Sequence, residues 1–278
     1  MVFEKEAKLR NWMRREAGML VAYSGGVDSA YLAKLATQEL ASKAVCVTGV
    51  SPSVSSYQLR AAERIAKTHG FQHLLIETTE LDDRSYRKNA GDRCYFCKSE
   101  LYRRIAKLGS CEFAGFVIVD GSNVDDAGDF RPGRRAAAER SIRSPLEEFG
   151  LTKEEIRIRS RVLGLETWDK PASPCLASRV AVGVPVTIGR LSKIERGEDI
   201  LRENGFREFR LRNHGETATI EIALSEMKDP HFEKTVMKAA AKIRGLGFRL
   251  VSINREGFRS GSFNGAPGAA RRRSDTFN

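Results

Sequence analysis

The sequence has no apolar run long enough to cross a membrane and no leader for export. An α-helix needs roughly 20 consecutive apolar residues to span a bilayer, and no run approaches that length. The N-terminal segment, MVFEKEAKLRNWMRRE, lacks the apolar core of a signal peptide. We therefore expect a cytoplasmic protein that does not associate with membranes.

Cysteine is scarce, and its number is odd. Five cysteines in a compartment that we expect to be reducing argue against a framework of disulfides. Cys94 and Cys97 form a C-x-x-C pair, and Cys175 stands alone in the segment PASPCLASR. Cys46 and Cys111 lie in apolar or mixed surroundings, and we assign neither of them a role.

Acidic residues are outnumbered by basic ones. The chain has 47 Lys and Arg against 36 Asp and Glu, a net charge of +11 over 278 residues. This balance suits anionic partners such as nucleotides, phosphorylated metabolites or RNA, although a basic surface facing solvent is an equally simple explanation. The length exceeds the roughly 100–200 residues of one compact domain, so we expect two domains or a large appendage.

Strand-like and helix-like segments alternate through the first two thirds of the chain. The predicted strands are 19–23, 44–50, 73–77 and 116–120, and the predicted helices are 29–40, 56–69 and 94–108. Alternation at this spacing is typical of a parallel sheet with helices on both faces. Thr152 and Glu155 have the spacing of a capping box and mark the start of another helix.

The pattern changes after Pro185. Helices near 188–204 and 231–244 flank the alternating segments FREFRLR and TATIEIAL, and a last strand is expected at 248–253. We therefore predict an α/β domain over residues 1–180 and a small α+β domain over 181–255. Residues 256–278 are rich in Gly and Ser and then basic, which indicates a disordered tail.

A glycine-rich turn lies between the first predicted strand and the following helix. Its sequence is SGGVDS, so Ser24, Gly25, Gly26 and Ser29 surround the start of the helix. Glycines permit close backbone approach, and a helix N-terminus offers unpaired N–H groups to a phosphate chain. The lysine of the G-x-x-x-x-G-K-[ST] loop is missing. The motif resembles the pyrophosphate loop of N-type ATP pyrophosphatases, which implies ATP cleavage between the α and β phosphates.

In that family the aspartate of the motif, here Asp28, is expected to help to hold Mg²⁺ on the pyrophosphate. A plain helix-capping role for Asp28 remains open. The run DGSNVDD follows the strand that ends at Asp120, so it is expected to line the nucleotide cleft at the same edge of the sheet. Asp125 and Asp126 are candidates for metal or substrate contacts, with capping or solvent exposure as the alternative.

The spacing of the cysteines indicates sulfur or metal chemistry. Cys94 and Cys97 would share one face of a helical turn beside Arg93 and Lys98, and nearby cations favour the thiolate. Cys175 lies among prolines and small residues that would expose its sulfur. Three cysteines could hold three irons of a [4Fe–4S] cluster and leave the fourth iron open for an extra sulfide. Zinc or unrelated thiols are the alternatives.

Five segments in a fixed order make a closer resemblance. SGGVDS, DRCYFCKSEL, DGSNVDDAGDFRPG, RSPL and WDKPASPCLASR together resemble the LarE group of ATP-dependent sulfur transferases, from about residue 10 to 255. The resemblance implies an adenine nucleotide alpha hydrolase-like fold and adenylation of a carboxylate of pyridinium-3,5-biscarboxylate mononucleotide. Sulfur then displaces AMP to leave a thiocarboxylate for a nickel-pincer cofactor.

The resemblance also implies a sulfur source and an assembly. Some members sacrifice the cysteine that corresponds to Cys175, whereas members with the extra C-x-x-C use a cluster on three cysteines. Because this chain has Cys94, Cys97 and Cys175, we favour the cluster and keep sacrifice of Cys175 as the alternative. A homo-oligomer formed through the smaller domain is expected.

Basic side chains of the second domain are candidates for the phosphate of the substrate. Arg210 and Arg212 alternate with apolar residues, so both guanidinium groups should emerge on one face of a strand. A polar sheet face without a ligand is the alternative. Ser178 and Arg179 are expected to contact the same mononucleotide. A divalent-metal site that includes Glu198, Glu221 or Asp229 is a further hypothesis.

Other functions are compatible with parts of this pattern. A tRNA thiolase would share the loop and the cysteines, but only 23 residues precede SGGVDS, and no basic-aromatic stripe suits stacking on RNA. A ligase such as GMP or NAD synthetase would not require three cysteines. A non-catalytic iron–sulfur or nucleotide-binding module would bind ATP without releasing pyrophosphate.

Overall fold

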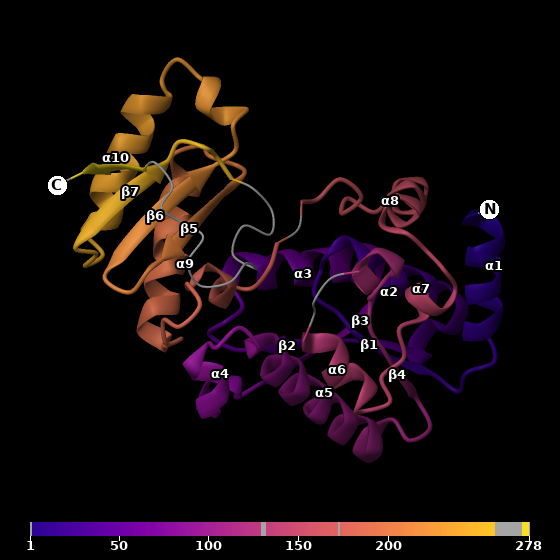
Figure 1. Cartoon of the computed structure of the whole chain (residues 1–278). Coiled ribbons are helices and arrows are strands. Elements are labelled where there is room, and N and C mark those ends of the chain that lie inside the picture. Colours follow the sequence, from indigo (N-terminus) through magenta and orange to yellow (C-terminus); the bar gives the residue numbers. More distant parts are fainter. Residues whose placement is uncertain (1, 129–131, 172, 259–273, 278) are drawn as a thin grey trace. The chain divides into compact units, whose positions relative to one another are not determined.

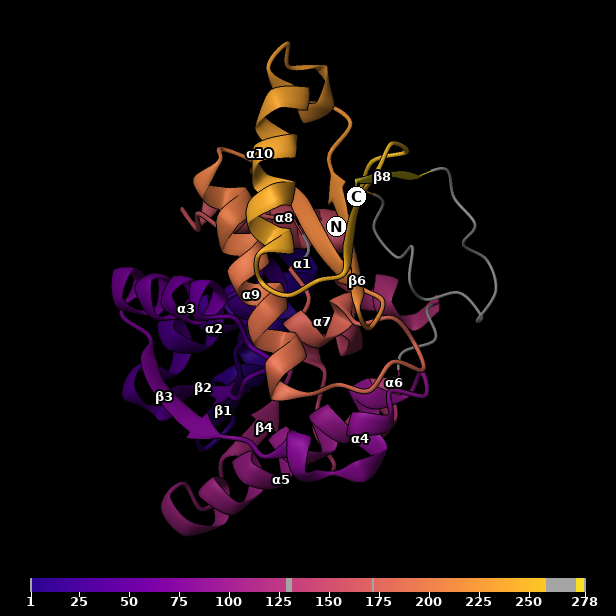
Figure 2. The same ribbon diagram turned by 90° about the vertical axis from the view of Figure 1, so that its left-hand side faces the viewer.

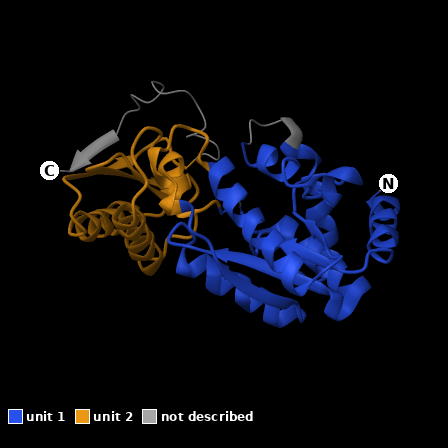
Figure 3. Cartoon of the chain, turned by 90° about the horizontal axis from the view of Figure 1, so that it is seen from below, with its two compact units in different colours: residues 1–80, 94–173 blue, residues 81–93, 174–278 orange. Residues whose placement is uncertain are grey.

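The computed structural model describes residues 2–128, 132–171, 173–258 and 274–277. The chain forms two compact units, residues 1–80 with 94–173 and residues 81–93 with 174–278 (Figure 3). Sequence analysis placed the boundary at residue 180 and assigned the short segment 81–93 to the first domain. In the part of the chain that the structure describes, no helix is both long and apolar enough to cross a membrane.

The first unit is built on a parallel sheet of the order β3-β2-β1-β4. The strands are β1 (Met19–Ala22), β2 (Ala44–Val50), β3 (Gln72–Glu77) and β4 (Val117–Val119). All of β1 is buried, as expected for a central parallel strand that is covered on both faces. The α/β class, with helices on both faces of a parallel sheet, is confirmed.

Helices cover the two faces of this sheet (Figure 1). One apolar cluster joins side chains of β1 to α1 (Val2–Met13), α2 (Val27–Leu40), α3 (Ser56–His69) and α8 (Lys153–Val162). The other joins the opposite side chains of β1 and β2 to α5 (Arg93–Glu112) and α6 (Pro132–Ala138). Because neighbouring residues of a strand face opposite sides, β1 contributes to both clusters.

Local sequence signals start and end several of these helices. The predicted capping box is present at α8, where Thr152 Oγ1 accepts from Glu155 N and a carboxylate oxygen of Glu155 accepts from Thr152 N. Ser55 caps α3, and Gly70 ends it in the left-handed conformation, with φ of 69°. The short helix α7 (Pro145–Glu148) connects the β4 side of the unit to α8.

The second unit is a smaller α+β layer structure. Strands β5 (Phe209–Asn213), β6 (Thr217–Ile222) and β7 (Leu250–Asn254) form its sheet, with β8 (Ser274–Phe277) paired to β7. Helices α9 (Ile188–Glu203) and α10 (Phe232–Arg244) lie side by side against it (Figure 2). Of the tail predicted to be disordered, residues 259–273 and 278 lie outside the described residues.

The segment 81–93 belongs to the second unit through direct hydrogen bonds. It contains α4 (Arg84–Lys88), which Asp83 caps. Asn89 follows α4 with φ of 55°, and its fully buried side-chain amide donates to the carbonyls of Ala181 and Val184 at 2.8 and 2.9 Å. The second unit is therefore assembled from two separate pieces of sequence.

Candidate functional site

The loop of Ser24 to Ser29 lies at the carboxyl end of β1 and leads into α2. The two hydroxyl groups of Ser24 and Ser29 are 3.1 Å apart, and Ser24 N donates to Ser29 Oγ at 3.2 Å. Gly26 N approaches Ser24 Oγ at 3.4 Å. These contacts fold the loop back on itself, so its backbone is arranged before any ligand arrives.

The two glycines leave room where side chains would not fit. Gly25 has φ of 67°, and a Cβ built on it would be 2.8 Å from both the Cα and the Cβ of Ala62 on α3. Gly26 stands at the N-cap position of α2, and among the described residues no side chain caps that helix. The first N–H groups of α2 are consequently available to an anion, as in other phosphate-binding turns.

Asp28 lies in the first turn of α2 and is engaged by two groups. Its Oδ1 accepts a hydrogen bond of 3.3 Å from Asn123 Nδ2, and its Oδ2 contacts the ammonium group of Lys153. Close by, a Cβ on Gly121 would be 3.0 Å from Ser29 N. The segment after β4 therefore runs directly beside the loop, at the sheet edge where the sequence analysis expected it.

Asp120 is a structural anchor of that segment. It is buried and accepts hydrogen bonds from Tyr102 Oη at 2.6 Å and from Ser144 Oγ at 2.8 Å. Burial opposes its charge, but the ammonium of Lys98 and these donors outweigh burial and lower the pKa of the carboxyl. Asp120 therefore fixes the end of β4 against α5 and the start of α7.

Asp125 and Asp126 act locally in the structure. Asp125 Oδ2 accepts from Lys153 N at 2.6 Å, and Asp126 Oδ2 accepts from Asn123 N at 3.2 Å. Both carboxylates bond backbone N–H groups, which is the capping alternative that the sequence analysis left open. They shape the turn that carries Asn123 to Asp28.

Lys170 lies beside the loop of Ser24 to Ser29, and the sequence alone did not indicate this. Its ammonium donates to the carbonyl of Gly25 at 3.1 Å. Burial lowers the pKa of Lys170, and the nearby cation Arg64 lowers it further. The segment WDKPASPC drew attention through its prolines and its cysteine. Its contact with SGGVDS could not be predicted, because the two segments lie far apart in sequence.

The cysteines belong to different units. Cys94 is exposed and Cys97 is half-buried, and both lie in the first turns of α5. Cys175 is half-buried in the second unit, at the N-cap of the 3-10 helix η4 (Leu176–Arg179). A cluster held by all three stays a prediction. The two cysteines without an assigned role differ: Cys46 is fully buried, and Cys111 is exposed.

The second unit brings the predicted phosphate residues around the turn of Cys175. Arg179 donates to the carbonyl of Cys175 at 3.0 Å and pairs with Glu198 at 2.8 Å. Arg212 donates to the carbonyl of Ser178 at 3.2 Å and pairs with Glu221 at 2.9 Å. Both ion pairs are buried, so they hold the two guanidinium groups in fixed places.

Arg210 completes a group of three arginines. Burial lowers its pKa to about 10, and the positive charges of Arg179 and Arg212 act in the same direction. A cation held against other cations is stabilised when an anion approaches. The group of Arg179, Arg210 and Arg212 is therefore suited to a phosphate with two negative charges.

The structure does not support the divalent-metal hypothesis for the second unit. Glu198 and Glu221 are each paired with an arginine, and Asp229 Oδ1 accepts from His231 N at 2.7 Å. Among the described residues of this unit, no three His, Cys, Asp or Glu side chains gather as a metal-binding group. Sequence reasoning could not distinguish carboxylates that bind arginine from carboxylates that bind metal.

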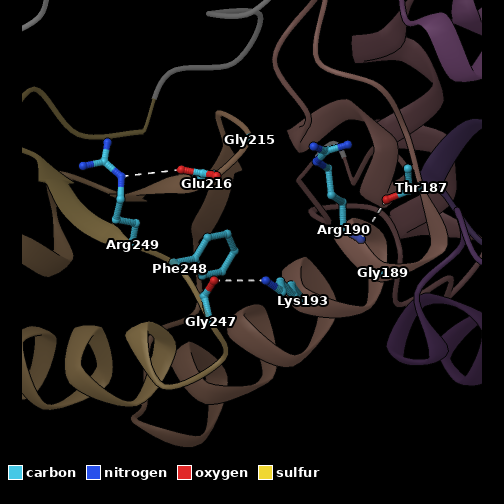
Figure 4. A pocket seen from close by; sticks show the side chains of 9 residues that line it. All are labelled: Thr187, Gly189, Arg190, Lys193, Gly215, Glu216, Gly247, Phe248 and Arg249. Carbon is cyan, nitrogen blue, oxygen red and sulfur yellow. Dashed lines mark hydrogen bonds and ion pairs between the residues drawn. The ribbon is translucent and has the colours of Figure 1, made fainter.

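The second unit also has an open hollow of about 770 Å³ at the start of α9 (Figure 4). Its lining includes Arg190, Lys193 and Arg249. Arg190 donates to Pro185 O at 2.9 Å, Lys193 donates to Gly247 O at 3.0 Å, and Arg249 lies 3.6 Å from Glu216. None of the residues that the sequence singled out lines this hollow, and we assign no ligand to it.

Comparison with known proteins decides the family. No family model matches the chain. The pyridinium-3,5-bisthiocarboxylic acid mononucleotide synthase of Lactiplantibacillus plantarum is 30% identical over 266 residues, which cover 94% of each chain. The chain belongs to the LarE family. This LarE-family chain is also 39% identical to an uncharacterized protein of Synechocystis, over 95% of this chain and 98% of that protein.

A third relative is similar along the whole of its length. An uncharacterized protein of Methanocaldococcus jannaschii is 31% identical to this LarE-family chain over 264 residues, 94% of this chain and 100% of that protein. All three alignments cover both compact units. The resemblance drawn from the ordered motifs is thereby confirmed.

Proposed function

We propose that this LarE-family chain is an ATP-dependent sulfur transferase that acts on a carboxylate of pyridinium-3,5-biscarboxylate mononucleotide. The main support is the similarity of this chain to a synthase named for the bisthiocarboxylic acid product. The similarity covers nearly the whole length of both chains. The preformed phosphate loop and the arginine group supply the two binding sites that such a reaction needs.

The first step requires activation, because a carboxylate oxygen is a poor leaving group. Ser24, Gly25, Gly26 and Ser29 present backbone N–H and hydroxyl groups to the phosphates of ATP, and Lys170 adds positive charge beside Gly25. The substrate carboxylate attacks the α-phosphorus, pyrophosphate leaves, and an acyl adenylate forms. Asp28 is the residue that would hold Mg²⁺, which neutralises charge on the pyrophosphate when it is bound.

The residues present fit that metal ion. Asp28 offers carboxylate oxygens, the ligands that Mg²⁺ prefers, and Asn123 orients one of them. The side chain of Asp28 is only partly buried, so solvent and a phosphate chain can reach it. This cradle of carboxylate, loop N–H groups and hydroxyls is suited to a metal-bound triphosphate.

Binding of the substrate phosphate falls to the second unit in this proposal. Arg179, Arg210 and Arg212 provide the charge, and the hydroxyl of Ser178 lies in the same turn. Fixing the phosphate orients the pyridinium ring for both steps. The buried pairs with Glu198 and Glu221 keep the guanidinium groups from rotating away.

The second step exchanges oxygen for sulfur. A sulfur nucleophile attacks the carbonyl carbon of the acyl adenylate, the bond to AMP breaks, and a thiocarboxylate remains. We propose that Cys94, Cys97 and Cys175 hold a [4Fe–4S] cluster, which supplies an open iron for an extra sulfide. In the alternative route Sγ of Cys175 itself attacks the acyl adenylate, AMP leaves, and a thioester forms. Loss of the Cα proton of Cys175 and cleavage of its Cβ–Sγ bond then release the thiocarboxylate and leave dehydroalanine.

Three cysteine sulfurs match the ligand type of such a cluster, and the basic residue Lys98 follows Cys97 in the chain. Cys175 is half-buried and directly precedes the short turn Leu176–Arg179. A homo-oligomer formed through the second unit belongs to the same proposal, and light scattering during size-exclusion chromatography measures it.

The test of the adenylation step is pyrophosphate release. With ATP, Mg²⁺ and the pyridinium biscarboxylate mononucleotide, the protein should release pyrophosphate and AMP in a substrate-dependent manner. Gly25→Ala should abolish both, whereas substitution of the exposed Cys111 by Ser should change neither. ATP binding without pyrophosphate release, at saturating substrate, would favour a non-catalytic module instead.

A further inference from the structure

A lysine from a distant helix lies on the carboxylate of the phosphate loop. Lys153 and Asp28 are 125 residues apart in sequence, yet the ammonium contacts Asp28 Oδ2 while Asn123 holds Oδ1. The side chains of Lys153 and Asp28 are 36% and 22% exposed. Solvent can reach this ion pair, so a ligand can compete for both of its members.

The backbone of Lys153 is fixed, although its side chain is not. Its N–H donates to Asp125 Oδ2, and the capping box of Thr152 and Glu155 sets the first turn of α8. Lys5 holds Glu155 in turn, at 2.8 Å. Only the flexible four-carbon stem of Lys153 must rotate to move its charge.

The chemistry of ATP gives this lysine a second partner. The loop lacks the lysine that other phosphate-binding loops place after their glycines, and most of the charge of ATP lies on its β and γ phosphates. A divalent ion competes strongly for a carboxylate that holds only a single ammonium. Once Asp28 turns to the ion, the released ammonium lies beside the phosphate chain.

We propose that Lys153 exchanges partners, an inference that rests on the proposed use of ATP. In the nucleotide-free protein it neutralises Asp28, and in the presence of Mg²⁺ and ATP it binds the terminal phosphates. The exchange makes the site selective for a triphosphate over AMP, because AMP has no β or γ phosphate for the lysine to contact. It also helps AMP to leave after sulfur transfer.

The test measures dissociation constants of ATP and AMP by calorimetry, with Mg²⁺ present. Lys153→Met should raise the constant for ATP about tenfold, because a charge-assisted hydrogen bond is lost, and leave that for AMP within about twofold. Lys153→Arg should restore most of the ATP affinity. Lys193→Met is the control: it removes a lysine whose ammonium donates to Gly247 O within the second unit, whereas the loop and the first turn of α8 belong to the first unit.

Chelation of the metal provides a second readout. Without Mg²⁺, Asp28 keeps the lysine, so the wild type and Lys153→Met should bind ATP with similar, weaker affinities. An equal loss of ATP and AMP affinity in Lys153→Met and in Lys153→Gln would overturn the exchange and leave Lys153 with a structural role. Unchanged ATP affinity would overturn it as well. Failure of the wild type to bind ATP at all would count against the proposed function rather than against this inference alone.

Discussion

Gly25 must be glycine for two independent reasons. Its φ of 67° is strained for an L-residue, and any Cβ would meet the backbone of Ala62 at 2.8 Å. A larger residue must therefore shift either the loop or α3. The loop that approaches α3 this closely is also the segment that we propose binds the phosphate chain of ATP.

We predict that Gly25→Ala weakens ATP binding more than tenfold, measured by calorimetry, because the loop N–H groups move out of register. Gly70→Ala is the control for strain alone. Gly70 has φ of 69° and open space around its Cβ position, so this change should lower stability by about 1 kcal/mol and leave ATP affinity intact. Equal ATP affinities for Gly25→Ala and the wild type would contradict the phosphate-loop assignment.

Arg210 illustrates a conflict between stability and binding. Its pKa is lowered to about 10 by burial and by Arg179 and Arg212. Because the folded protein holds this proton less tightly than the unfolded chain, the charge on Arg210 destabilises the folded state. This destabilisation is lost as pH rises through 10, the folded pKa, toward the pKa of 12.5 in the unfolded chain. A site that stores such repulsion gains when a phosphate arrives.

We predict that Arg210→Met leaves the melting temperature equal or higher while the affinity for the mononucleotide falls at least tenfold. Glu198→Gln should do the opposite to stability, because it leaves the buried Arg179 without its partner, at a cost of about 3 kcal/mol. Thermal melts with and without substrate measure both effects. A strongly destabilised Arg210→Met with normal substrate affinity would assign this arginine to the fold.

At the scale of the elements, a buried polar network joins α1, α2 and α8. Glu6 on α1 accepts from Arg159 of α8 at 2.5 and 3.0 Å and from Tyr31 of α2 at 2.8 Å, and Arg10 donates to it as well. Burial opposes the charge of Glu6, but these donors outweigh it and lower its pKa to about 2. The network fixes the two helices whose first turns carry Asp28 and Lys153.

We predict that Glu6→Gln lowers the free energy of unfolding at neutral pH by about 3 kcal/mol. Because the folded pKa lies below the unfolded value of 4.5, the wild type has this stabilisation above pH 4.5 and loses it as pH falls toward 2. Urea unfolding at several pH values should show the difference between the two proteins shrinking in that window.

Glu139→Gln is the matched comparison for the Glu6 network. Glu139 pairs with Arg135 at 3.3 Å and accepts a hydrogen bond from Tyr95 Oη at 2.6 Å, and the side chains of Arg135 and Glu139 are 66% and 49% exposed. Its replacement should change stability by less than about 0.5 kcal/mol at any pH. A similar loss in both variants would show that Glu6 stabilises the protein no more than a surface ion pair does.

Local signals in the sequence predicted the elements well, and contacts between distant segments were predicted poorly. The loop after β1 and the capping box of α8 involve neighbours in sequence, so their patterns could be recognised. Lys153 and Lys170 reach the loop from 125 and 145 residues away, and neither lies in a periodic pattern that would indicate this. Likewise, no composition change marks the segment 81–93 as part of the second unit.

At the scale of the whole molecule, the chain enters the second unit twice. Asn89, which is fully buried at φ of 55°, bonds the carbonyls of Ala181 and Val184 and accepts from Arg93 at 2.6 Å. Val186 N also donates to Arg87 O at 2.9 Å. These contacts hold the start of the second unit, which includes the turn of Cys175, to the segment that precedes α5.

We predict that Asn89→Ala destabilises the protein by about 3 kcal/mol, since it removes the buried hydrogen bonds of the side-chain amide and strains a left-handed residue. Asn89→Gly should lose less, because only the hydrogen bonds are removed. Proteolysis under native conditions should cleave the second unit of Asn89→Ala first. If both variants resisted proteolysis as well as the wild type, the segment 81–93 would contribute little to the stability of that unit.

We propose that this protein exchanges a carboxylate oxygen for sulfur in a reaction that cleaves ATP. Protein reconstituted with iron and sulfide without oxygen should be incubated with ATP, Mg²⁺ and the pyridinium biscarboxylate mononucleotide, and product and protein masses followed together. We predict a product about 16 Da heavier for each converted carboxylate, release of AMP, and an unchanged protein mass. A protein about 34 Da lighter at Cys175 would replace the cluster route with sacrifice of that cysteine. Thiolation of tRNA in a parallel assay, with the mononucleotide unchanged, would contradict the account.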